Sequence, residues 1–117
     1  IACSAYQDPV IRHLAATKFH SFVFNSGRTK FLENTNKLLG KYEPVNGMKT
    51  GFTNAAGRCL IASASIGGRN LIFVQLGSRT SSIFDDAERM FDWALGGVSV
   101  VQNDTKTPAA RRFFKNP

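Results

Sequence analysis

The sequence predicts an α+β domain in which an antiparallel sheet is flanked by helices. Two apolar runs, residues 58–65 and 70–76, flank a short segment with two glycines, and this pattern is typical of a β-hairpin. Beyond them, apolar residues recur at helical spacing between positions 83 and 94. Strands and helices do not alternate regularly along the chain, so the order of elements favours an antiparallel layered fold over a doubly wound parallel sheet.

The N-terminal part predicts one helix and a first hairpin. Asp8 is a favourable N-cap, Pro9 suits the first helical position, and the apolar residues that follow are spaced as on one face of a helix ending near Thr17. Residues 22–24 and 29–32 then flank an Asn-Ser-Gly turn, which predicts a hairpin. Residues 33–47 contain several Asn, Gly and Pro residues and are expected to form a loop.

The second half predicts two buried strands and a closing helix. Both strands are almost continuously apolar, so we expect helices to cover the sheet on both faces. Residues 82–85 resemble a capping box with Asp85 in the acidic position, and the helix is expected to end at Gly96-Gly97. Several aromatic side chains are expected to pack in the core or between helix and sheet: Phe22, Phe24, Phe73, Phe91 and Trp93.

Length, charge and cysteine content limit the classes of protein. A chain of 117 residues with 43% hydrophobic residues is one small domain or part of a larger one. No apolar run approaches the roughly 20 residues of a membrane-spanning helix. Four of the charges behind the net +7 lie in residues 105–117, so we expect no nucleic-acid partner and interpret residues 98–117 as a basic linker or tail after a domain at 1–97. Cys3 and Cys59 are compatible with one disulfide or with two unpaired, buried thiols.

One short motif could carry chemistry. Lys49-Thr50-Gly51 lies just before the first apolar strand. Alone it is also compatible with a strand end that carries an exposed lysine, because a three-residue motif is weakly specific. Its surroundings make it specific, since it lies in a V-N-G-M-K-T-G-F-T segment that is followed by Ala56-Gly57.

This segment resembles the third motif of the low-molecular-weight penicillin-binding proteins, the serine-type D-alanyl-D-alanine carboxypeptidases. The similarity continues through residues 60–64 and the last predicted helix, and Asn34-Thr35-Asn36 resembles the N-x-N loop that precedes the motif. It covers roughly residues 5–97 and implies a β-lactamase/DD-peptidase-like fold that is incomplete in this chain. It also implies the periplasm or the extracellular face of a bacterial cell envelope.

The resemblance implies a role for each residue of the motif. Lys49 would place a cation beside a serine nucleophile and the substrate carboxylate, and would help to relay protons. Thr50 would offer its hydroxyl to that carboxylate, and Gly51 would let an extended peptide lie against the strand edge. The backbone N–H of Phe52 would contribute to the oxyanion hole. Thr53 and Arg79 complete the expected substrate-binding set, and no metal or organic cofactor is expected.

The chain also departs from the family pattern. None of its serines begins S-x-x-K, which supplies the nucleophile, or S-x-N, which completes the proton network. Relatives often place an arginine just before the phenylalanine that opens the last helix, where this chain has Ile83; Arg79 is a candidate replacement. We therefore expect the C-terminal part of a catalytic domain, inactive alone, with the N-terminal part as a possible separate chain.

The predicted function is that of a serine D-Ala-D-Ala carboxypeptidase, which trims peptidoglycan stem peptides through an acyl-serine intermediate. Its partners would be peptides ending in D-Ala-D-Ala, and β-lactams. One alternative is a class A β-lactamase, although Thr53 with Ala56-Gly57 fits the carboxypeptidase pattern better. Another is a non-catalytic penicillin-binding-like domain that binds a peptide or a partner protein, which the missing serine motifs favour. A nucleic-acid-binding module rests on net charge alone.

Overall fold

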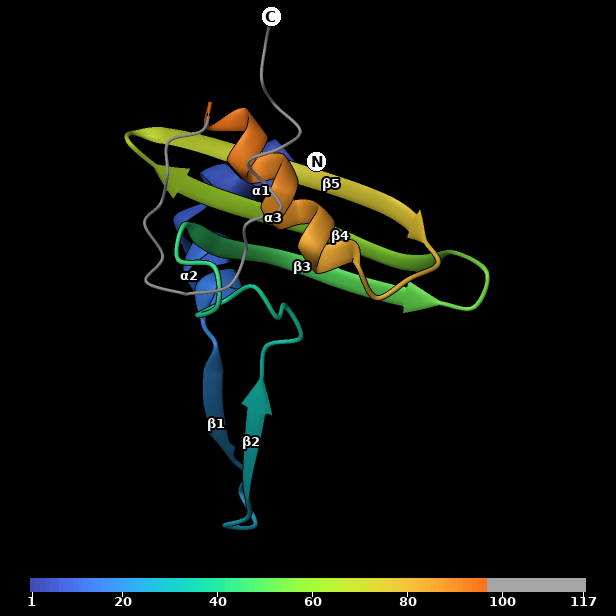
Figure 1. The fold of residues 1–117 in the computed structure, drawn as a ribbon. Coiled ribbons are helices and arrows are strands. Elements are labelled where there is room, and N and C mark those ends of the chain that lie inside the picture. The colour runs from blue at the N-terminus through green and yellow to red at the C-terminus, as the bar shows by residue number, and fades with distance from the viewer. Residues whose placement is uncertain (97–117) are drawn as a thin grey trace, which may run out of the picture.

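The computed structural model describes residues 1–96 and contains three helices and five strands within them (Figure 1). The predicted tail, and Gly97 with it, lie outside the described residues. The elements follow in the order α1 (Ala2–Gln7), α2 (Pro9–Ala16), β1 (Phe19–Val23), β2 (Thr29–Glu33), β3 (Val45–Thr53), β4 (Gly57–Ile66), β5 (Arg69–Ser78) and α3 (Ile83–Ala94).

The main sheet has the strand order β3-β4-β5, and both pairs are antiparallel. Helix α3 lies across one face of it, while α1 and α2 lie on the opposite side (Figure 1). Strands β4 and β5 are joined by the predicted hairpin turn, with Ile66 opposite Arg69. The prediction of an antiparallel sheet flanked by helices is therefore confirmed. None of the helices among residues 1–96 is long and apolar enough to cross a membrane.

Strands β1 and β2 form the predicted first hairpin, in which Phe19 lies opposite Glu33. This hairpin projects away from the main sheet, so the described part of the molecule measures 63 Å along its longest axis (Figure 1). Its aromatic side chains are exposed, including Phe31 at 82%. The prediction that Phe22 and Phe24 belong to the core is wrong, because no second layer covers this hairpin within residues 1–96; their rings pack on each other instead, 5.0 Å apart.

The core lies between the main sheet, α3 and the loop at residues 34–44. Phe91 is 2% exposed, and Phe73 packs against this cluster with its ring centroid 6.2 Å from that of Phe91, as predicted for both. The loop contributes Leu38, Leu39 and Tyr42, so a segment predicted only as irregular is an integral part of the core. Trp93 is 60% exposed, which shows the prediction that it packs between helix and sheet to be wrong.

The structure confirms one of the two predicted helix caps. Asp8 caps α2 as predicted, because its carboxylate accepts hydrogen bonds from the N–H groups of Val10 and Ile11 at 2.8 and 3.1 Å. Ser82 occupies the N-cap of α3, but its side chain makes no capping hydrogen bond. Its hydroxyl lies 3.4 Å from the carboxylate of Asp86 instead, so the predicted capping box with Asp85 is wrong.

The strands are less covered than predicted. In β4 the side chains of Leu60, Ala62 and Ala64 are buried, whereas Leu76 of β5 is 72% exposed. β5 is an edge strand with nothing paired to its outer edge among residues 1–96. Although these strands are apolar on both faces, the described residues therefore do not bury both faces.

Two elements were not predicted. Helix α1 carries no apolar stripe, and only Tyr6 of its residues is buried. Strand β3 contains Asn46, Gly47 and Gly51, which are poor strand formers, and its pairing with β4 fixes it as a strand. The K-T-G motif therefore lies within β3, consistent with the strand edge that the resemblance implied at Gly51, and not in a loop ahead of the apolar strand β4.

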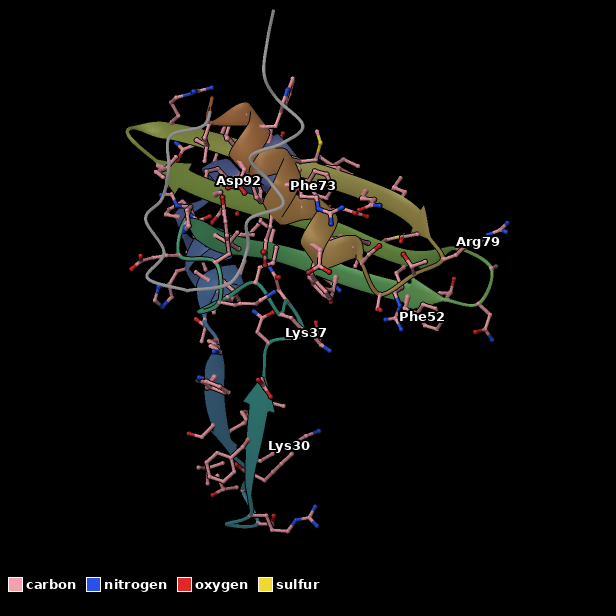
Figure 2. All side chains as sticks on the ribbon, viewed as in Figure 1. Lys30, Lys37, Phe52, Phe73, Arg79 and Asp92 are labelled. Carbon is pink, nitrogen blue, oxygen red and sulfur yellow. The ribbon has the colours of Figure 1, made fainter. Side chains whose placement is uncertain are left out.

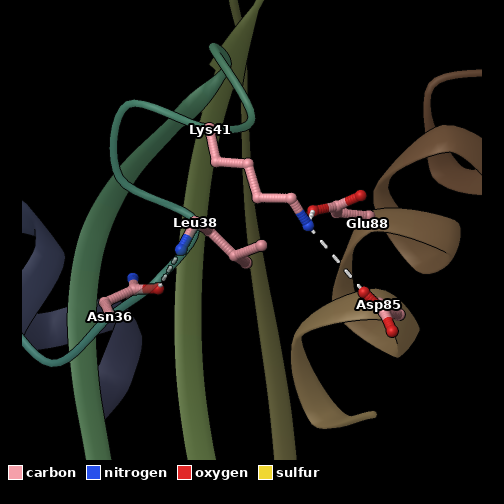
Figure 3. Close-up of polar contacts among 5 residues, drawn as sticks. All are labelled: Asn36, Leu38, Lys41, Asp85 and Glu88. Carbon is pink, nitrogen blue, oxygen red and sulfur yellow. Dashed lines mark hydrogen bonds and ion pairs between the residues drawn. The ribbon is translucent and has the colours of Figure 1, made fainter.

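The loop at residues 34–44 is joined to α3 by polar contacts as well as by its apolar side chains. Lys41 Nζ lies 3.0 Å from Glu88 Oε1 and 3.9 Å from Asp85 Oδ1 (Figure 3). These pairs are exposed and contribute little to stability. The Tyr42 hydroxyl donates a 2.6 Å hydrogen bond to Asp92 Oδ1, and its buried ring stacks on that of Phe91. Burial, followed by the hydrogen bond to Asp92 and the nearby carboxylates, raises the pKa of Tyr42 above its usual value.

Replacing Phe91 should strongly destabilise the chain. We expect Phe91→Ala to lower the free energy of unfolding by about 3–5 kcal/mol, because a large buried ring is lost and leaves a cavity. The matched control, Trp93→Ala on the exposed side of the same helix, should cost less than about 1 kcal/mol. Urea denaturation of the variants measures both values, and equal losses would contradict the assignment of Phe91 to the core.

Tyr42 should make stability depend on pH in the alkaline range. Below the unfolded-state pKa of about 10, the neutral phenol is present in both states and its bond to Asp92 contributes fully. As the pH rises above that value, the unfolded chain loses the proton while the folded chain retains it, so the contribution decreases.

The stability difference between the natural chain and Tyr42→Phe should therefore be about 2 kcal/mol at pH 8 and decrease above about pH 10. Denaturation at several pH values measures this difference. A difference that stays constant through pH 11 would contradict the raised pKa.

Candidate active site

The K-T-G motif lies in β3, at one edge of the main sheet. Thr50 lies opposite Leu60 and Gly51 lies opposite Cys59 in β4, while no described strand pairs with the other edge of β3. Lys49 and Gly51 are exposed and Thr50 is half-buried. The Lys49 ammonium donates a hydrogen bond to the carbonyl oxygen of Thr50. The motif is therefore accessible along an open strand edge, the type of surface to which an extended peptide can add as a further strand.

The loop at residues 34–36 holds this strand in place. The buried Asn36 amide donates a 3.0 Å hydrogen bond to the carbonyl oxygen of Gly47, and its Oδ1 accepts one from the N–H of Leu38 at 3.1 Å. Asn34 donates to the carbonyl oxygens of Ala15 and Thr17, at 3.1 and 3.0 Å. The two asparagines thus connect the end of α2 to the start of β3.

Between them, Thr35 reaches the motif itself. Its hydroxyl makes a hydrogen bond with the hydroxyl of Thr50. The sequence drew attention to the N-x-N loop, but it gave no sign of which residue Thr35 would contact. Only the folded arrangement of the loop beside β3 brings these two side chains together.

The beginning of β3 is packed closely against its neighbours. A Cβ at Gly47 would lie 3.2 Å from both the Ala15 Cβ and the Ser63 hydroxyl, so a larger residue there would push α2 away from β3. The Asn46 amide donates to Ser65 Oγ at 2.8 Å and accepts from Ser63 Oγ at 2.7 Å. Ser63 and Ser65 are therefore structural residues, as predicted.

The end of β3 carries the remaining predicted residues. Thr53 Oγ1 accepts a 3.0 Å hydrogen bond from the N–H of Ala56, which orders the turn into β4. Gly57 in that turn has a φ of +70°, and a Cβ there would lie 2.9 Å from the carbonyl oxygen of Ser78. Only glycine fits this conformation and close approach without strain.

Phe52 and Arg79 lie at this same end of the sheet (Figure 2). The Phe52 side chain is exposed, and the guanidinium of Arg58 lies 5.4 Å from the centre of its ring. Arg79 is exposed just beyond the end of β5, whereas Ile83 is 2% exposed within the core. Of these two positions, only 79 carries an exposed cation.

Other side chains considered from the sequence do not join this site. Cys3 is exposed, Cys59 is half-buried, and both are free thiols; burial of both is thus wrong. Within residues 1–96, no group of three or more His, Cys, Asp or Glu side chains gathers as metal ligands would.

Comparison with known families identifies the chain. The sequence model of the Peptidase_S11 family, described as D-alanyl-D-alanine carboxypeptidase, matches residues 1–80. The chain belongs to this family. The resemblance inferred from the K-T-G segment is confirmed, and the match favours the carboxypeptidases over the class A β-lactamases.

Relatives agree in sequence and in fold. The D-alanyl-D-alanine carboxypeptidase DacB2 of Mycobacterium tuberculosis is 30% identical over 96 residues, which are 79% of this chain and 33% of that protein. The Streptomyces K15 DD-transpeptidase is 28% identical with a TM-score of 0.72, over 79% of this chain and 37% of that one. Penicillin-binding protein D2 of Listeria monocytogenes, in its cefotaxime-bound form, is 31% identical with a TM-score of 0.63, over 76% of this chain and 35% of that one. The chain thus spans about a third of the length of each.

Removing the Asn36 side chain should loosen the site. We expect Asn36→Ala to lower the free energy of unfolding by about 2–3 kcal/mol, because the buried carbonyl of Gly47 loses its donor. The control Lys37→Ala, at the exposed neighbouring position (Figure 2), should change it by less than about 0.5 kcal/mol. Hydrogen exchange of the β3 amides should accelerate in the first variant only, and unchanged exchange would contradict the bracing role of Asn36.

Proposed function

We propose that this chain forms the K-T-G wall of the active site of a serine D-Ala-D-Ala carboxypeptidase. The complete enzyme removes the terminal D-alanine of peptidoglycan stem peptides through an acyl-serine intermediate. The observation that carries this proposal is the position of K-T-G on an exposed strand edge with which no strand of residues 1–96 pairs, braced by the 34–36 loop, in a chain of this family. The proposed location of the enzyme is the periplasm or the extracellular face of a bacterial cell envelope.

Each residue of the motif has a role that its position supports. Lys49 is exposed, so its ammonium can turn from the Thr50 carbonyl toward a bound carboxylate and a serine nucleophile. Thr50 donates its hydroxyl proton to the terminal carboxylate of the peptide. Gly51 has no side chain to keep an added peptide strand away from the edge. The N–H of Phe52 serves the oxyanion that forms when the serine attacks.

Thr53 and Arg79 bind the substrate at the end of the sheet where β3 and β5 both terminate. Thr53 orders the turn after β3, and the Arg79 guanidinium supplies a further positive charge at that end of the sheet. β-Lactams bind along the same edge as the peptide. Their carboxylate lies beyond the carbonyl that acylates the serine, just as the terminal carboxylate of the peptide lies beyond the carbonyl of the bond that is cleaved.

The nucleophile comes from a segment with S-x-x-K and S-x-N, which these 117 residues do not contain. This segment is the N-terminal part of the same catalytic domain, and it packs on apolar surface that the described residues leave open. Leu76 on β5 and Phe31 on the first hairpin belong to that surface. Residues 1–97 are then the C-terminal part of the catalytic domain, and 98–117 are a basic linker or tail.

A second candidate is a non-catalytic domain that binds peptides or a partner protein along β3. The absence of both serine motifs from the sequence favours it. The two candidates differ in whether any polypeptide that contains or accompanies this chain forms a covalent adduct with a β-lactam.

Intact mass spectrometry after exposure to a labelled penicillin separates the two candidates. The carboxypeptidase predicts that a polypeptide with S-x-x-K gains the label, and that Lys49→Ala slows acylation by about 100-fold or more. Lys30→Ala, on the hairpin far from β3 (Figure 2), is the matched control and should react at the natural rate. A sample with no labelled polypeptide would support the non-catalytic candidate.

A further inference from the structure

Thr35 differs from its two neighbours in what its side chain contacts. Asn34 and Asn36 bind backbone carbonyl oxygens of α2, its C-cap and β3, so both ends of the short loop are fixed. Thr35 instead makes a side-chain contact with a residue of the K-T-G motif, through the hydroxyl of Thr50. The N–H of Asn36 also donates a 3.0 Å hydrogen bond to Asn34 Oδ1, which orders the loop around Thr35.

The pair lies where a ligand can reach it. Thr35 is exposed and Thr50 is half-buried, and both lie beside the edge of β3 that no described strand pairs with. Each hydroxyl has a single proton and accepts through its lone pairs. A carboxylate only accepts hydrogen bonds, so Thr50 must use its one proton when it binds one. The proton between the two threonines must then come from Thr35.

We propose that Thr35 is a positioning residue that donates its hydroxyl proton to Thr50 Oγ1 and thereby directs the Thr50 proton toward the carboxylate of the substrate. This inference rests on the proposed role of Thr50 in binding that carboxylate. Donation into the Thr50 oxygen holds its rotamer and polarises its O–H bond, which strengthens the bond that Thr50 donates to an anion. A loop that only supported β3 mechanically would not require a hydroxyl at position 35.

The test measures the second-order rate of acylation by labelled penicillin, in the full-length enzyme that carries this chain together with S-x-x-K and S-x-N. Thr35→Val keeps the shape and removes the hydroxyl, and we expect it to slow acylation about tenfold. Thr35→Ser keeps the hydroxyl and should remain within about a factor of two of the natural rate. The matched control is Thr29→Val on the exposed hairpin strand, which should leave the rate unchanged.

A double-mutant cycle tests whether Thr35 acts through Thr50. In the Thr50→Val background, the change Thr35→Val should cause no further loss, because the group that it positions is absent. Equal rates for Thr35→Val and the natural protein would overturn the inference, as would a Thr35→Ser variant as slow as Thr35→Val. Additive losses in the cycle would also overturn it, because Thr35 would then act independently of Thr50.

These outcomes are distinct from failure of the proposed function. A natural protein that does not react with penicillin at all refutes the carboxypeptidase, and this inference with it. A natural protein that reacts normally while Thr35→Val reacts equally fast refutes only the role of Thr35. Thr35→Ala repeats the measurement if the valine variant unfolds, as judged from its circular dichroism.

Discussion

The hydrogen bond from the buried Asn36 amide to the carbonyl oxygen of Gly47 is the contact on which the arrangement of the site depends. Leaving a buried acceptor without its donor is costly in free energy, so the bond fixes the position of the loop on β3. This bond affects the residues on either side of Asn36. On its N-terminal side, Thr35 lies beside Thr50. On its C-terminal side, Leu38 and Tyr42 pack in the core and fix the same loop against α3. One short segment therefore positions the exposed motif and also fills the core.

This arrangement separates stability from chemistry across the main sheet. The face that meets α3 is packed around Phe91, whereas the outer edge of β3 carries the charged and polar motif. The described residues leave the outer edge of β5 unpaired and the hairpin aromatics exposed. The chain spans 33% of DacB2 and 37% of the Streptomyces K15 DD-transpeptidase. In the function proposed above, β3 is one wall of a cleft, and the serine nucleophile belongs to the other.

Local patterns predicted the elements that depend on local chemistry. The Asp8-Pro9 start of α2, the hairpin of β4 and β5, and the stripe of α3 all follow from spacing and turn residues. Strand β3 could not be predicted in this way, because its asparagine and glycines disfavour a strand and only pairing with β4 stabilises it. Residue type predicts that Phe24 lies in the core and that Trp93 packs between helix and sheet, but the exposure of both depends on which layers surround them.

The same distinction applies to the site. Lys49, Thr50 and Gly51 could be recognised from the sequence because they are adjacent and because the residues on either side of them also match the family motif. The contact between Thr35 and Thr50 joins residues 15 positions apart, and the bond from Asn36 to Gly47 spans 11. Contacts at such separations depend on the path of the chain, which neither spacing nor composition specifies.

The first hairpin has a simple geometric consequence. Its two ends meet at the body of the molecule, where the N–H of Asn34 donates a 2.8 Å hydrogen bond to the carbonyl oxygen of Lys18. Residues 19–33 therefore leave the body of the molecule and return to it at the same point. Neither strand of the hairpin pairs with the main sheet among residues 1–96, so a change in the length of the hairpin would leave the pairing of β3 with β4 intact. The geometry of the strand that carries the motif is thus independent of how far the hairpin projects.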